Sequence, residues 1–208
     1  MIPARVALAG AALVALASAG VAAAPRVTPG ECARDGLYCL YRSILPSAGL
    51  VADCRSATDC RVGYYYGAPE QATWFTPPAG TPTFPKPTVT WHTATLAEAR
   101  FPCGPGCATS YFFEARRRRV SAPRPDVLQV DPTRQLLAAT SGRALVVSQI
   151  FAGREVARIE RPWAPAPRLG EVVTAVRFDP DGRLTFTWLR GEERAPVTER
   201  VVVPSIPR

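Results

Sequence analysis

A ten-residue pattern that occurs twice in the second half of the chain constrains the fold more than any other feature. Residues 127–136 read Val-Leu-Gln-Val-Asp-Pro-Thr-Arg-Gln-Leu, and residues 175–184 read Ala-Val-Arg-Phe-Asp-Pro-Asp-Gly-Arg-Leu. In each copy, apolar and β-branched residues flank a turn that is built around Asp-Pro. The sequence therefore contains the same strand–turn–strand unit twice, which predicts a β-rich protein.

Alternating apolar residues predict further strands around these two units. Leu184, Phe186 and Trp188 alternate with threonines, which is typical of a strand in a half-buried antiparallel sheet. Glycine-containing pairs such as Asp181-Gly182 mark the reversals between strands. The expected strands lie near 126–130, 135–140, 144–150, 155–160, 172–178, 183–190 and 196–203.

The repeated unit resembles the blades of WD40-like β-propellers. Phe178–Leu184 resembles the turn between the first two strands of a blade, and 145–147 with 153–156 resembles its third and fourth strands, although the Gly-His and Trp-Asp signatures are absent. Propellers typically close with about four to eight blades, whereas residues 88–203 hold at most three blade lengths. The expected fold is all-β, an antiparallel meander of blade-like hairpins that forms an open sheet, a sandwich or an incomplete propeller.

The N-terminal residues have the pattern of an export signal. A short basic segment is followed by an apolar run rich in alanine and then by small residues, so 1–24 is expected to be a cleaved signal peptide. Glycines and prolines interrupt 25–75, which is expected to be an irregular, Cys-rich, disulfide-tied region. Prolines exclude regular structure from a connector at 76–87, and 88–208 is expected to be the antiparallel β domain.

Six cysteines in an exported chain indicate disulfide bonds. Their spacing favours three local pairs, Cys32–Cys39, Cys54–Cys60 and Cys103–Cys107, among the 15 connectivities that six cysteines allow. A zinc site is the alternative, but no spacing is a clean Cys-x2-Cys. No metal and no cofactor are expected.

Two aromatic segments are expected to be strands. Gly63–Gly67 encloses three tyrosines, with Tyr65 expected to be buried and its two neighbours half-exposed. The segments 88–95 and 110–115 are expected to form a long hairpin whose tip is closed by the Cys103–Cys107 bridge.

Candidate catalytic groups are scarce. His92 is the single histidine and lies within an expected strand, and no Gly-x-Ser-x-Gly motif accompanies it. Glu98 and Glu114 could lie diagonally across the hairpin and serve as the carboxylate pair of a hydrolase. No catalytic residue is assigned, and the hydrolase remains an alternative.

The run Arg116, Arg117, Arg118 and Arg119 is the most conspicuous charged segment. The formal net charge is +8 and Lys86 is the single lysine, so the basic character comes from arginine. In a regular strand these four side chains would alternate between two faces, so either the strand frays or both faces are wet. The run is interpreted as a solvated strand end or as a patch that contacts an anionic or protein partner.

The sequence favours a periplasmic or secreted binding or structural protein of a bacterial envelope, without enzymatic activity. The partner would be an unknown protein or an anionic envelope component. Nucleic-acid binding is not expected because no fold signature for it is present, and no later segment is apolar enough to cross a membrane. The alternatives are a secreted hydrolase that uses a carboxylate pair and a secreted enzyme inhibitor that presents the Cys103–Cys107 loop.

Overall fold

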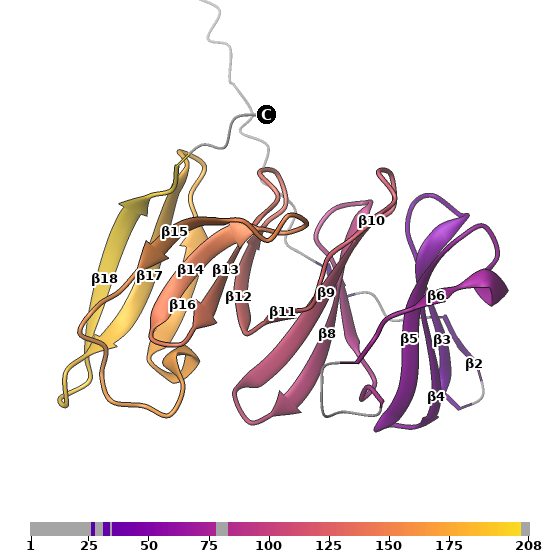
Figure 1. Ribbon diagram of the computed structural model, residues 1–208, viewed down its shortest axis with the longest axis horizontal. Helices are drawn as coiled ribbons and strands as arrows, with labels where there is room; N and C mark the ends of the chain where they lie inside the picture. The colour runs from indigo at the N-terminus through magenta and orange to yellow at the C-terminus, as the bar shows by residue number, and fades with distance from the viewer. Residues whose placement is uncertain (1–25, 28–30, 34, 78–82, 205–208) are drawn as a thin grey trace, which may run out of the picture.

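A computed structural model describes residues 26–27, 31–33, 35–77 and 83–204. The expected signal peptide and part of the Pro-rich connector lie outside these residues. Eighteen strands and two short 3-10 helices form in the described part of the chain. The strands make four antiparallel sheets that stand in a row in the order of the sequence (Figure 1). Neither short helix, Pro69–Gln71 or Leu169–Glu171, is long or apolar enough to cross a membrane.

The first two sheets contain the disulfides. The first sheet consists of β2 (Glu31–Ala33), β3 (Tyr38–Arg42), β4 (Ala48–Ser56), β5 (Asp59–Tyr66) and β6 (Thr73–Trp74). The second sheet consists of β1 (Arg26–Val27), β7 (Thr88–Trp91), β8 (Leu96–Gly104), β9 (Cys107–Glu114), β10 (Arg119–Val120) and β11 (Arg124–Pro125). Cys32–Cys39, Cys54–Cys60 and Cys103–Cys107 are bonded, which confirms the predicted pairs.

The repeated unit forms the opening hairpin of each of the last two sheets. The third sheet consists of β12 (Val127–Asp131), β13 (Leu136–Ser141), β14 (Ala144–Gln149) and β15 (Glu155–Ile159). The fourth sheet consists of β16 (Val173–Phe178), β17 (Arg183–Arg190) and β18 (Ala195–Val202). All seven strands lie where the alternation pattern predicts them.

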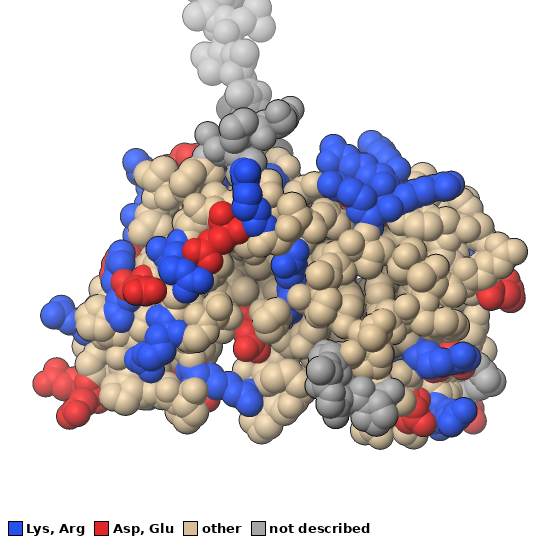
Figure 2. Space-filling view, in the orientation of Figure 1, with Lys and Arg blue, Asp and Glu red and all other residues tan. Residues whose placement is uncertain are grey.

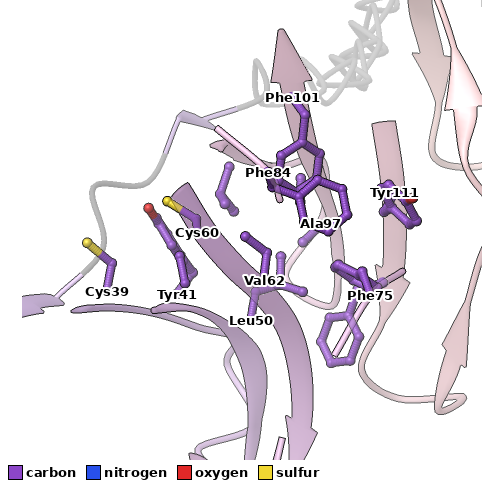
Figure 3. Packing of buried hydrophobic residues seen from close by; sticks show 14 of the residues in the cluster. Cys39, Tyr41, Leu50, Cys60, Val62, Phe75, Phe84, Ala97, Phe101 and Tyr111 are labelled. Atoms are coloured by element: carbon purple, nitrogen blue, oxygen red, sulfur yellow. The ribbon is translucent and has the colours of Figure 1, made fainter. Parts of the chain in front are cut away.

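The core lies between successive sheets rather than inside one of them. Between the first and second sheets, buried side chains from facing strands interdigitate, among them Leu50, Val62, Phe84, Phe101 and Tyr111 (Figure 3). Two further apolar clusters lie between the second and third sheets and between the third and fourth sheets. Each sheet therefore depends on its neighbours for burial of its apolar face.

The two middle sheets are covered on both faces, and the third shows this in its sequence. In β13, Leu136 and Ala138 pack toward the fourth sheet, whereas Leu137 and Ala139 pack toward the second sheet. All four side chains are buried. A strand that is buried on both faces reads as a continuous apolar run, and the outer strand β18 instead alternates between exposed and half-buried positions.

The first sheet corrects the prediction of an irregular region at 25–75. Two glycines of this segment, Gly49 and Gly63, lie inside strands at positions where a side chain would not fit. A Cβ atom at Gly49 would lie 2.5 Å from the Tyr41 carbonyl oxygen, and one at Gly63 would lie 2.4 Å from the carbonyl oxygen of Thr73. Tyr65 is buried and its tyrosine neighbours are half-buried, as predicted.

The expected strand at 88–95 is shorter than predicted. It ends at Trp91, and the chain bends before β8 begins at Leu96. The Thr93 hydroxyl oxygen accepts hydrogen bonds from the backbone N–H groups of Thr95 and Leu96 at 3.2 and 2.9 Å. A threonine side chain that binds the following backbone in this way competes with strand pairing, and the bend takes His92 out of the sheet.

Candidate functional site

The arginine run lies on the turn that joins β9 to β10. Strand β9 ends at Glu114, the chain turns through Ala115–Arg118, and Arg119 pairs back onto Glu114. Arg118 has φ of 48°, a left-handed conformation that closes a tight reversal. The run is therefore not a strand with alternating faces, because the chain reverses inside it.

Three of the four arginines are exposed together. Arg116, Arg117 and Arg118 are exposed, and a patch of basic side chains gathers where Figure 1 places this turn (Figure 2). Glu114, the nearest acid along the chain, is buried and accepts the backbone N–H of Arg116 at 3.3 Å. In the described part of the chain, the side chains of Arg116 and Arg117 have no ion pair, so their charge is available to an external anion.

A cluster of aromatic rings packs against this turn. The Arg118 guanidinium lies over the Tyr66 ring at 5.3 Å, and the Tyr66 ring contacts Tyr64 and Phe113 with centroid distances of 5.7 and 5.4 Å. A guanidinium on a tyrosine face is held by cation–π attraction of about 0.5–1 kcal/mol where it is exposed. Packed rings therefore give the turn a rigid base.

Tyr66 is expected to be the last tyrosine to ionise. Burial raises its pKa to about 12 from 10.0, Tyr64 and Glu114 add to this, and Arg118 opposes it. Because the folded protein favours the protonated phenol, this contribution to stability is present below pH 10 and lost as pH rises through about 12. A phenolate absorbance titration should show a final step that disappears in Tyr66→Phe. Superimposable curves for the two proteins would contradict this assignment.

Arg119 points away from the other three arginines. Its Nη2 donates to the Gln135 side-chain oxygen at 2.8 Å, and its guanidinium lies over the Phe151 ring at 4.4 Å. It therefore contacts the third sheet, where it lines a small pocket with Arg134 and Gln149. The sequence did not indicate Arg134 as part of a site. The sequence signal that could have identified Arg134 was its position in the Asp-Pro turn. This turn lies at the same end of the sheets as the arginine turn.

Glu98 lies at the centre of a buried hydrogen-bonded cluster between the second and third sheets. Its carboxylate accepts a hydrogen bond from the Ser110 hydroxyl at 2.5 Å and lies 2.9 Å from the His92 Nε2 atom. The Arg100 guanidinium is 3.8 Å away. Burial alone would raise the pKa of Glu98, but the hydrogen bonds from His92 and Ser110 outweigh it and lower the pKa.

This cluster has the residue types of a hydrolase but not its arrangement. The Ser110 hydroxyl binds the carboxylate and not the imidazole, so no base is placed to activate it. Ser110 is also fully buried, at 0% exposure. The His92 ring packs against Phe112 at a centroid distance of 6.2 Å. The arrangement suits a structural polar cluster that fills the space between two sheets.

The register places Glu98 and Glu114 diagonally across the β8–β9 hairpin, as predicted, but each carboxylate binds a different partner. Phe112 lies directly opposite Glu98 on the neighbouring strand, and Glu114 lies two residues further along that strand, on the same face. Glu98 turns toward Ser110, which is on the other side of Phe112, and Glu114 turns toward the backbone of Arg116. The two carboxylates therefore have separate partners and do not face a shared substrate position.

The Cys103–Cys107 hairpin borders a cleft of about 440 Å³ between the second and third sheets. Pro102 and Gly104–Gly106 are exposed, and the Arg168 side chain donates to the Pro105 carbonyl oxygen, which fixes the tip against the chain near the second short helix. Arg100 and Glu171 are the charged residues that line the cleft. The Glu98 carboxylate is not among its lining groups.

No group of three or more His, Cys, Asp or Glu side chains is placed to hold a metal ion in the part of the chain that the structure describes. Comparison with protein-family models, with curated proteins and with solved structures found no match for this chain. The candidate functional site therefore rests on the geometry of the arginine turn and of the pocket beside it.

Proposed function

We propose that this chain is an exported binding protein that presents Arg116, Arg117 and Arg118 to an anionic component of a bacterial envelope. The observation that carries the proposal is the exposure of three arginines on one ordered turn, none of them with an ion pair among the described residues. Because Glu98 and Glu114 are held by separate buried contacts, the proposal assigns no catalysis to them.

Export is supported by the disulfides and by the sequence of the first 24 residues. Three disulfides persist in oxidising compartments such as the periplasm or the extracellular space and are rare in the cytosol. The apolar run that precedes them has the pattern of a signal peptide. Both features suit a partner outside the cytoplasm.

The strength of the expected contact follows from the number of charges. An arginine near an anionic lipid surface contributes about 1 kcal/mol, and this contribution falls with ionic strength. Two arginines therefore account for about 2 kcal/mol, which is about 30-fold in affinity. Binding through the turn should be reversible and strongly dependent on salt.

The proposal is tested with two matched double variants. Arg116→Gln/Arg117→Gln removes two charges from the turn, and Arg55→Gln/Arg190→Gln removes two exposed arginines elsewhere. We expect the first variant to bind phosphatidylglycerol vesicles about 10- to 30-fold more weakly than the unmodified protein in a sedimentation assay at low salt. The second variant should change binding by less than about threefold.

Equal loss in the two variants would show that only net charge matters and would overturn the role of the turn. Absence of vesicle binding by the unmodified protein at low salt would overturn the proposal for lipid surfaces of this kind.

A further inference from the structure

A small pocket lies beside the arginine turn, between the second and third sheets. It has a volume of about 100 Å³. Its walls come from β10, from the turn between β12 and β13, from the end of β14 and from the turn that follows β14. The lining residues are Arg119, Arg134, Gln135, Gln149, Phe151 and Ala152. A volume of this size can hold several waters or one small oxyanion.

Arg119 is fixed in this pocket with one donor left over. Its Nη2 is bound to Gln135, and its guanidinium carbon lies over the Phe151 ring. These two contacts hold the guanidinium in one orientation. Its Nε–H is buried and has no hydrogen-bond partner in the described structure.

Arg134 lines the same pocket and is held by hydrogen bonds of its own. Its Nε donates to Asp131 at 2.5 Å, and its Nη1 donates to the Gly182 carbonyl oxygen at 2.9 Å. Its Nη2 is buried and has no partner among the described residues. Both guanidinium groups are therefore held by contacts of their own where they line the pocket.

Two guanidinium groups that line one small pocket give it positive charge and hydrogen-bond donors. Asp131 offsets the charge of Arg134, and its oxygens also accept backbone N–H groups of Thr133 and Arg134 at 3.0 Å. The charge of Arg119 is not offset by an ion pair with any residue that the structure describes, so the pocket favours an anion.

We propose that this pocket binds a single phosphoryl group. Guanidinium groups match phosphate oxygens in geometry and charge better than ammonium groups do. Arg119, which lines the pocket, directly follows the exposed turn in the sequence. A phosphate-bearing partner could therefore place one phosphoryl group in the pocket while Arg116 and Arg117 contact its neighbouring anions. This assignment to a partner rests on the proposed function, whereas occupation of the pocket by phosphate is tested independently of it.

Inorganic phosphate is the first probe, and the readout is calorimetry together with the NMR signal of the Arg119 Nε–H group in the full chain. Ala152 is exposed at the pocket rim, so Ala152→Glu adds a negative charge there without altering the core. The matched control is Ala195→Glu, an exposed alanine on β18. We expect saturable phosphate binding that shifts the Arg119 signal and that weakens about tenfold or more in Ala152→Glu. It should change by less than about twofold in Ala195→Glu.

A conservative variant of Arg119 tests the pocket with less risk of disturbing the fold. Arg119→Lys keeps the charge but removes the planar group, and it should also weaken phosphate binding by about tenfold. A water-filled pocket would give no saturation and no movement of the Arg119 signal, and either result overturns the inference. Equal weakening in the two glutamate variants also overturns it, because that result reports net charge alone.

Two further measurements separate the sources of the phosphoryl group and separate this inference from the proposed function. If vesicles that contain phosphatidic acid lose binding in Ala152→Glu, the source is a lipid headgroup. If only inorganic phosphate loses binding, the source is free phosphate. Arg116→Gln/Arg117→Gln should retain phosphate binding within about threefold, so failure of vesicle binding and failure of the pocket give different results.

Discussion

Replacing Glu98 with alanine is expected to lower the free energy of unfolding by about 3 kcal/mol. The Ser110 hydroxyl, at 0% exposure, would lose its acceptor, and His92 would lose its partner. Each buried polar group that is left without a partner costs about 1–3 kcal/mol. Denaturant unfolding at neutral pH measures the loss, which should appear as a lower midpoint with an unchanged slope.

The pH dependence of this effect has a definite sign. The pKa of Glu98 is lowered in the folded protein from its ordinary value of 4.5, so the folded state favours the ionised form. The stabilisation is present above pH 4.5 and is lost as pH falls through the lower, folded pKa. Glu98→Gln should keep most of the packing and lose this acid-dependent part, so the stability difference from the unmodified protein should shrink at low pH.

The same variant distinguishes a structural cluster from a catalytic one. Residues that are held in place for catalysis often cost stability, so replacing them can stabilise a protein. A more stable Glu98→Gln protein would therefore contradict the structural interpretation and would renew interest in Glu98 as an acid or base. A less stable protein agrees with the hydrogen-bond geometry.

The parts of the fold that follow from local pattern could be predicted from the sequence. Alternation in β17 and the Asp-Gly reversal at Asp181-Gly182 fix the fourth sheet, because one face of that sheet is exposed and the pattern is therefore visible. Short cysteine spacings made the three local disulfides the simplest pairing. Both features depend on residues that are close in the sequence.

The first sheet could not be predicted because its glycines have a long-range cause. Glycine inside a strand weakens it in isolation, so Gly49 indicated an interruption and Gly63 indicated the end of a strand. In the folded chain, close approach of other strands and of the Tyr65 ring requires the absence of a side chain at these positions. That requirement depends on packing between strands and is not visible in local composition.

The site was predicted in part for a similar reason. The charge of the arginine run is evident, but the reversal at Arg118 decides that three side chains face solvent and that Arg119 turns toward the third sheet. The second arginine of the pocket, Arg134, is brought near Arg119 by the packing of two sheets. Sequence spacing alone does not reveal such a meeting.

Replacing Phe113 with alanine is expected to have the largest effect, a loss of about 3–5 kcal/mol in the free energy of unfolding. Phe113 is fully buried, and its ring contacts Tyr64 and Tyr66 of the first sheet and Trp91 of the second, with centroid distances of 6.0, 5.4 and 6.5 Å. The matched control is Val202→Ala on the exposed side of β18, which should change stability by less than about 0.5 kcal/mol.

The shape of the Phe113→Ala transition tests whether the disulfide-tied first sheet is an integral layer of the stack. The two sheets share one apolar cluster, so neither can bury its face alone and both should unfold together. We therefore expect one cooperative transition, shifted to lower denaturant, whether it is followed by tyrosine or by tryptophan signals. Two separated transitions would show that the first sheet is an independent unit. In that case the aromatic base under the arginine turn would be a domain boundary, and the turn would lose the rigidity on which its proposed role depends.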